Sequence, residues 1–336
     1  MHLCRLLLLL PALVLSACGD SHSLELTGQA MGTTFNVVLV EPPESIATDA
    51  LENDLVGALQ TVDRLASTWR DDSELTAFNL EQSVDWIPVS QQFCALLESA
   101  LAVSEATGGA FDLTIGPLTN LWGFGPDGQI NDPPSDDAIA AAQQRVGFQN
   151  LEADCREQRV RKNFPDLYVD LSGWAKGYAV DQLAELLDAR GIDNYLVEIG
   201  GELRVKGKNR ENGKWAIGIE APSTSARVPH AILHVTDTSV ATSGDYRNYF
   251  EYAGQRFSHT IDARTGRPVI HNLAAVTVVN PSTAYADAMA TALLVLGPDD
   301  GPQLAQELGI AGYFLVRNQT GIREITTSDF DKLSAL

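Results

Sequence analysis

The chain has 336 residues, of which 45% are hydrophobic and 20% are charged, so it can bury a core and does not have the composition of a disordered protein. Lysine and arginine total 23 against 44 aspartates and glutamates, which gives a net charge of −21. A nucleic-acid partner is therefore not expected, because phosphate binding requires a basic surface. An anionic ligand must be held against this charge by local cations or a metal ion.

Residues 1–17 are typical of a secretory signal. Arg5 precedes an apolar stretch that is too short to span a membrane, and small residues follow before Cys18. This start resembles a bacterial lipoprotein signal, in which Cys18 is acylated and becomes the new N-terminus; the alternative is an ordinary signal cut beside a chance cysteine. We expect residues 18–30 to be a lipid-anchored polar tether, on the periplasmic side of the cell envelope, with the inner membrane favoured.

The remaining cysteines, Cys94 and Cys155, could pair in an exported protein, but their spacing does not decide this. The sequence contains no Cys-x-x-Cys motif, so no structural zinc site is expected.

Hydrophobic periodicity predicts a mixture of helices and strands. The predicted helices are 51–67, 91–106, 136–146, 176–190 and 284–296. The predicted strands are 34–40, 167–169, 195–199, 215–220, 231–235, 249–252, 256–261, 276–279 and 313–316. Strands dominate the second half, which favours an α+β fold over a doubly wound parallel sheet. The breaker-rich stretch 125–135 is either a surface excursion or a boundary between two subdomains.

Residues 108–125 hold five glycines beside Phe111, Trp122 and Phe124. Glycines let the backbone approach a ligand closely, and aromatic side chains can bound a flat ring. The segment can equally be a glycine-rich turn over a core.

Residues 170–181 run from a predicted strand into a predicted helix, with Lys176 in the first turn. Backbone N–H groups at a helix N-terminus favour an anion, and Lys176 adds a full positive charge. The alternative is a solvated lysine on a surface helix. The P-loop and dinucleotide fingerprints are absent from this segment.

Asp287 and Thr291 lie four residues apart in an otherwise apolar helix, so they share one face. An aspartate there is costly unless it is paired or bound to a cation, and these oxygens suit Mg²⁺. Alternatively, Thr283 and Asp287 cap the helix without any metal.

Residues 258–268 contain His259 on a predicted strand and Asp262 at the start of a turn. A neutral imidazole could take a proton from a hydroxyl near pH 7, and Asp262 could orient it. A structural histidine is the alternative.

Taken in order, these segments resemble the ApbE family of bacterial flavin transferases. The resemblance covers about residues 27 to 330, and we place a single catalytic domain at 31–330. The matching pieces are 31–35, 73–79, 108–125, 170–181, 198–202, 242–249, 258–268 and 286–297.

The resemblance implies an α+β fold of antiparallel sheet and helices, and an enzyme that moves the FMN half of FAD onto a threonine hydroxyl of a partner protein, releasing AMP. The residues it places against FAD are Met31, Ala110, Phe111, Asp112, Asp170, Lys176 and Ile261. The ligands it implies for Mg²⁺ are the backbone oxygen of Gly173 and the side chains of Asp287 and Thr291.

One position departs from the pattern, since Ala290 stands where some members carry a further aspartate. Water or substrate phosphate would complete the metal shell. The acceptor is expected to be a subunit of a membrane redox-driven ion pump or electron-transfer complex. Two other functions stay open, a Mg²⁺-dependent FAD pyrophosphatase and a non-catalytic flavin-binding lipoprotein.

Overall fold

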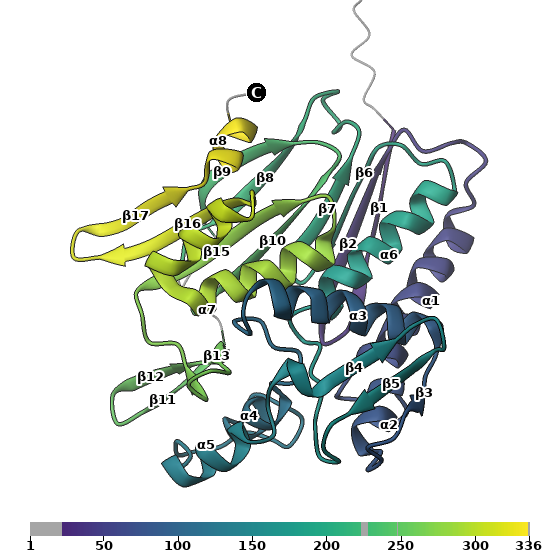
Figure 1. Cartoon of the computed structure of the whole chain (residues 1–336). Helices are drawn as coiled ribbons and strands as arrows, with labels where there is room; N and C mark the ends of the chain where they lie inside the picture. Colours follow the sequence, from purple (N-terminus) through teal and green to yellow (C-terminus); the bar gives the residue numbers. More distant parts are fainter. Residues whose placement is uncertain (1–21, 223–227, 247, 335–336) are drawn as a thin grey trace, which may run out of the picture.

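The structure, a computed structural model, describes residues 22–222, 228–246 and 248–334, so the predicted signal and Cys18 lie outside the described residues. Its central element is an eight-stranded sheet in the order β1-β2-β6-β7-β10-β15-β16-β17, and every neighbouring pair is antiparallel (Figure 1). The strands are β1 Ser23–Ala30, β2 Thr33–Val40, β6 Tyr195–Ile199, β7 Glu202–Lys206, β10 Thr238–Gly244, β15 Leu273–Asn280, β16 Ala311–Asn318 and β17 Gly321–Thr326. The predicted α+β class is confirmed.

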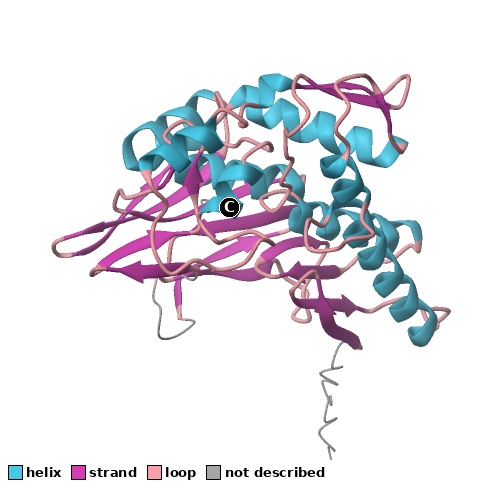
Figure 2. Cartoon of the chain, turned by 90° about the horizontal axis from the view of Figure 1, so that it is seen from below, coloured by secondary structure: helices cyan, strands magenta, loops and turns pink. Residues whose placement is uncertain are grey.

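The larger helices gather on one face of the sheet (Figure 2). They are α1 Thr48–Ala66, α3 Gln91–Ala106, α6 Ala175–Ala189 and α7 Thr283–Glu307. The other face is covered by β8 Trp215–Glu220, β9 Pro229–Val235 and α8 Ser328–Ser334. The inner strand β15 is accordingly apolar and buried along nearly its whole length, as expected of a strand covered on both sides.

Smaller elements complete the fold around the helices. They are α2 Glu74–Leu80, β3 Ile87–Pro88, α4 Gly116–Leu121, α5 Asp136–Gln143, the 3₁₀ turn Phe148–Asn150, β4 Leu151–Asp154, β5 Arg159–Lys162, β11 Tyr249–Tyr252, β12 Gln255–Ser258, β13 Ile261–Asp262 and β14 Arg267–Pro268.

The prediction of a tether up to residue 30 is wrong from Ser23 onward, because Ser23–Ala30 pairs with β2 as an edge strand. Leu24 and Leu26 alternate with polar residues, and Leu26 is buried against the helical layer. This alternation of apolar and polar residues indicates a strand, but the polar composition of the segment favoured a tether.

The predicted strand at 167–169 is also absent. A side chain takes the place of a neighbouring strand there, because the amide of Asn79 both donates to the carbonyl of Val169 (2.8 Å) and accepts from its N–H (2.8 Å). The helix predicted at 136–146 ends earlier, at Gln143, and its cap is Ser135, whose side chain accepts from the N–H of Ala138.

Cys94 and Cys155 form a disulfide that joins α3 to the turn after β4, with the two Cα atoms 5.5 Å apart. This answers the question that their spacing left open. Among the described residues, no helix is both long enough and apolar enough to cross a membrane.

Ion pairs hold α6 against β7. Arg204 lies 3.2 Å from the Asp181 carboxylate, and Lys206 lies 3.0 Å from that of Asp188. Because side chains alternate along a strand, these cations share the face of β7 that meets the helix. The position of α6 is therefore fixed by charge as well as by apolar packing.

Candidate active site

The site is built where the first turns of α6 and α7 meet. A methyl group on Gly177 would lie 2.5 Å from the carbonyl oxygen of Thr283, so only glycine lets the helices approach this closely. The Asp181 carboxylate of α6 accepts from the backbone N–H groups of Thr283 (2.9 Å) and Ala284 (3.0 Å). One helix thus caps the other, and their starts are held in a fixed register.

Asp287 projects from α7 into this crossing and is only 3% exposed. Its Oδ2 accepts from the backbone N–H of Gly177 (3.2 Å) and lies 3.6 Å from the Nζ of Lys176. The cap of α7 is Ser282, whose side chain accepts from the N–H of Tyr285. The alternative interpretation of Asp287 as a cap of its own helix is therefore wrong.

Thr291, one turn further along α7, meets the loop before α6. A methyl group on Gly173 would lie 3.4 Å from Thr291 Oγ1 and 3.3 Å from the ring of Phe111. The hydroxyl of Ser243, on β10, lies 3.0 Å from that of Thr291. The sequence did not single out the Ser243 hydroxyl as a site group, although Ser243 lies in residues 242–249, one of the segments that match the family. Ala290 is fully buried in the core.

These groups form a set of hard oxygen donors. Asp287 supplies a carboxylate and Thr291 a hydroxyl, and the Gly173 backbone passes beside Thr291, so that its carbonyl would add a third oxygen of the kind that Mg²⁺ prefers. In the part of the chain that the structure describes, no three His, Cys, Asp or Glu side chains cluster as metal ligands. One buried carboxylate with a hydroxyl one turn along the same helix would suit a Mg²⁺ ion that keeps several water or substrate ligands.

Lys176 is not a solvated surface lysine. Its ammonium lies 2.9 Å from Glu202 Oε1 as well as 3.6 Å from Asp287, and its side chain is 31% exposed. Burial acts to lower the pKa of Lys176, but the two carboxylates together raise it above its ordinary value. The lysine is therefore a permanent cation at the N-terminal end of α6.

The 108–125 segment contributes both packing and site residues. Ala110 and Phe111 are buried, with Phe111 against the Gly173 loop. A methyl group on Gly116 would collide with the ring of Tyr168, so this glycine is required by packing. This glycine, at the start of α4, is therefore explained by packing without any ligand.

Two predicted site aspartates turn their carboxylates into the fold. Asp112 accepts from the backbone N–H groups of Thr114 (2.8 Å) and Phe148 (3.1 Å), and burial raises its pKa. Asp170 accepts from the N–H of Ser172 (2.8 Å). Both side chains therefore shape the loops on which they lie.

Met31 and Ile261, both predicted to contact FAD, lie in two different parts of the fold. Met31 lies in the turn between β1 and β2 with a positive φ of 51°, and it packs against the core under the helices. Ile261 is buried with Trp122 and Leu118 in a separate cluster beneath β11 and β12.

His259 follows β12, and its side chain is partly open to solvent and partly covered by Asn248 and Phe124. Its Nδ1 lies 3.0 Å from the carbonyl oxygen of Asn248, and its ring stands edge-on to Phe124, with the centroids 6.3 Å apart. Desolvation lowers the pKa of His259, and the positive charge of Lys176 acts in the same direction. The imidazole is therefore neutral near pH 7 and able to accept a proton.

Asp262 does not orient His259 in this structure. Its two carboxylate oxygens accept from the guanidinium of Arg264 at 2.8 and 2.9 Å. The imidazole contacts the Asn248 carbonyl and the ring of Phe124 instead.

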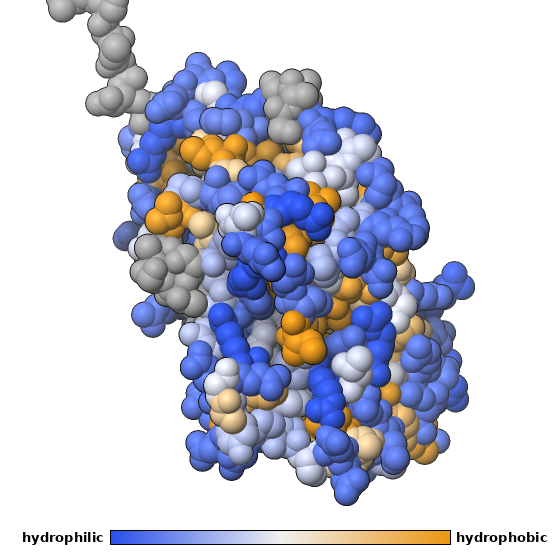
Figure 3. All heavy atoms as spheres, turned by 90° about the vertical axis from the view of Figure 1, so that its left-hand side faces the viewer, coloured by the Kyte–Doolittle hydropathy of each residue, from blue (hydrophilic) through white to orange (hydrophobic). Residues whose placement is uncertain are grey.

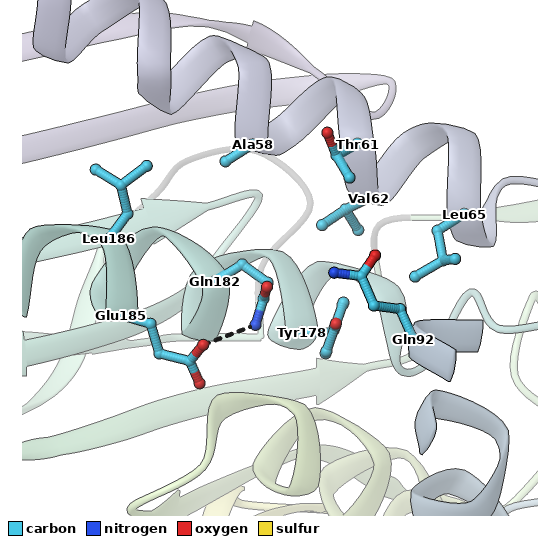
Figure 4. Close-up of a pocket in the computed structure, with 9 residues that line it drawn as sticks. All are labelled: Ala58, Thr61, Val62, Leu65, Gln92, Tyr178, Gln182, Glu185 and Leu186. Carbon is cyan, nitrogen blue, oxygen red and sulfur yellow. Dashed lines mark hydrogen bonds between the residues drawn. The ribbon is translucent and has the colours of Figure 1, made fainter. Parts of the chain in front are cut away.

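Two hollows in the described part of the chain are lined by none of Lys176, Asp287 and Thr291. One, of about 360 Å³, lies between α1, α3 and α6 and is lined on α6 by Tyr178, Gln182 and Glu185, not by Lys176 (Figure 4). A second, of about 410 Å³, is lined by residues including Asn79 and Tyr168.

The face shown in Figure 3 is mainly hydrophilic with small separated apolar areas, in keeping with the acidic composition.

The fold is that of flavin transferases. The structure of "Flavin Transferase ApbE from Vibrio cholerae" superposes with a TM-score of 0.87 at 38% identity, covering 93% of this chain and 99% of that one. The chain belongs to the ApbE family, whose profile matches residues 31–314. Relatives named FAD:protein FMN transferase occur in Vibrio cholerae (40% identity; 95% of each chain) and Haemophilus influenzae (40%; 96% of this chain and 95% of that one).

Proposed function

We propose that this protein is an FAD:protein FMN transferase that uses Mg²⁺ to move the FMN half of FAD onto a threonine of an acceptor protein. The observation that carries the proposal is the crossing of α6 and α7, which brings a lysine, a buried carboxylate and a hydroxyl together in a chain of the ApbE family. Flavin transfer itself is the activity named for full-length relatives at 40% identity.

The charges at the crossing suit a pyrophosphate. FAD brings two negative phosphates to a protein whose net charge is −21, so the repulsion must be offset locally. Lys176 provides one positive charge, and Asp287, Thr291 and the Gly173 carbonyl would hold Mg²⁺. When bound, the ion would neutralise charge on the phosphate oxygens as the phosphorus–oxygen bond is exchanged.

The acceptor hydroxyl would attack the phosphorus next to the riboflavin half. The new bond joins the threonine oxygen to that phosphorus, and the bond to the bridging oxygen breaks, so AMP leaves. His259 would take the hydroxyl proton, which its lowered pKa permits at neutral pH. Because the side chain of His259 is partly open to solvent, water could also take the place of threonine, and hydrolysis of FAD to FMN and AMP is the second candidate function.

We also propose an envelope location. Cys18 would carry the lipid anchor, and the acceptor would be a subunit of a membrane redox-driven ion pump or electron-transfer complex. The Cys94–Cys155 disulfide supports export, because disulfides persist in oxidising compartments.

The test is incubation of the protein with FAD, Mg²⁺ and a threonine-bearing flavoprotein subunit. Flavin fluorescence that stays with the subunit after denaturing electrophoresis is the expected result. Free FMN without a fluorescent subunit would favour the hydrolase instead. Failure to release AMP with any divalent metal would leave a flavin-binding protein without turnover.

A further inference from the structure

Glu202 is a buried carboxylate beside the proposed phosphate site, and no role has yet been assigned to it. It opens β7, directly after the Gly200–Gly201 turn, and is 5% exposed. Its Oε1 lies 2.9 Å from Lys176 Nζ, whereas its Oε2 is buried with no hydrogen-bond partner among the described residues. Such a half-satisfied carboxylate is costly, so stability alone does not account for it.

The Glu202–Lys176 pair also differs from the other ion pairs between β7 and α6 in which element supplies the acid. In those pairs the strand supplies the cation and the helix the acid, as with Arg204 and Asp181. At Glu202 the strand supplies the acid and the helix the lysine. Lys176 thereby stands in the first turn of α6, where the helix dipole disfavours a cation.

Lys176 has two carboxylates within reach, and Glu202 is the nearer. The ammonium is 2.9 Å from Glu202 and 3.6 Å from Asp287. The stem of the lysine is confined as well, since a methyl group on Gly200 would lie 3.4 Å from its Cδ. Without the charge of Glu202, the ammonium would move toward Asp287, the other buried acid.

We propose that Glu202 is a positioning residue that holds the Lys176 ammonium off Asp287, so that the lysine meets a phosphate of FAD and Asp287 stays available to a cation. The inference rests on the proposed function, because it takes Lys176 as a phosphate contact. Glu202 acts through Lys176 and need not touch the substrate.

The test is the affinity for FAD in EDTA, where metal-dependent turnover is blocked, measured by fluorescence titration of the wild type, Glu202→Gln and Lys206→Gln. Loss of a negative charge near the phosphates would by itself tighten FAD binding. Loss of the lysine's position predicts the opposite sign, a weakening of about tenfold, the size expected for one charge-assisted hydrogen bond. Lys206→Gln breaks another ion pair on the same strand and should change the affinity by less than about twofold.

Unchanged or tighter FAD binding by folded Glu202→Gln would overturn the inference. If that variant does not fold, Glu202→Asp serves instead, because its shorter side chain cannot reach the lysine in the same way; an unchanged affinity there has the same meaning. Lys176→Met distinguishes a failure of this inference from a failure of the proposed phosphate role of Lys176. If it weakens FAD binding and the Glu202 variants do not, only this inference fails; if it leaves binding unchanged, the phosphate role of Lys176 fails.

Discussion

Asp287 is the residue on which the proposed chemistry depends most. Its carboxylate is buried between the N–H of Gly177 and the shared ammonium of Lys176, a position that suits a cation as a third partner. Asp287→Ala should abolish Mg²⁺-dependent turnover, with a loss of at least about 10²-fold in kcat, as for removal of one group that stabilises transition-state charge. AMP release in a coupled assay measures this.

Asp136→Ala is the matched control. Its carboxylate also pairs with a cation, Arg267, but its side chain is 88% exposed, so the pair contributes little. Full activity in Asp287→Ala, or an equal loss in both variants, would remove Asp287 from the metal site.

His259 makes a prediction about pH. Because desolvation lowers its pKa, the imidazole stays neutral to a lower pH than a free histidine does. The rate of a reaction that needs it as a base should hold on going from pH 8 to about 6.5, the ordinary histidine pKa, and fall only below that value.

His259→Gln should lower kcat by roughly 10²–10⁴-fold and abolish the acid limb of the profile. Profiles of kcat and of kcat/KM against pH check both. An acid limb that persists unchanged in the variant would show that another group takes the proton.

At the scale of elements, the crossing of α6 and α7 is what assembles the site. Gly177→Ala would place a methyl group 2.5 Å from a backbone oxygen of α7, which cannot move as a side chain can. We expect a loss of about 1–3 kcal/mol in unfolding free energy, typical of overpacking, together with weaker metal binding. Thermal unfolding and Mn²⁺ titration measure the two effects.

Gly57→Ala is the control within another helix. Apart from the adjacent residues and the backbone of α1 itself, no atom lies within 4 Å of the added methyl group, so the substitution should be neutral or stabilise by about 0.5–1 kcal/mol. If Gly177→Ala behaved in the same way, the close contact of the helices would not be what fixes the site.

The elements that the sequence predicted well are those with long apolar periods. Helix α1 buries Leu51, Leu55, Leu59 and Val62 on one face, which is the spacing that predicted it. The misses have local causes. Ser23–Ala30 has only two leucines to mark its inward side. Residues 167–169 are held by the side chain of Asn79, a contact that no local sequence pattern predicts.

At the scale of the molecule, pattern and resemblance anticipated the class of fold and singled out the segments around Lys176 and Asp287 that meet at the candidate site, but not how they meet. The i, i+4 spacing placed Asp287 and Thr291 on one face of a helix. It could not show that Ser243 lies beside Thr291, or that Glu202 shares Lys176. Those contacts join residues far apart in the chain, so they follow from the packing of α6 and α7 on the sheet rather than from any local period.

The most direct test of the central claim is mass spectrometry of an acceptor subunit after incubation with FAD and Mg²⁺. The wild-type protein should add one FMN by a phosphoester bond to a threonine, with AMP released in equal amount. EDTA or Asp287→Ala should leave the acceptor unmodified. An acceptor that stays unmodified with the wild-type protein while FMN and AMP accumulate, or one that is modified equally by Asp287→Ala, would contradict the account.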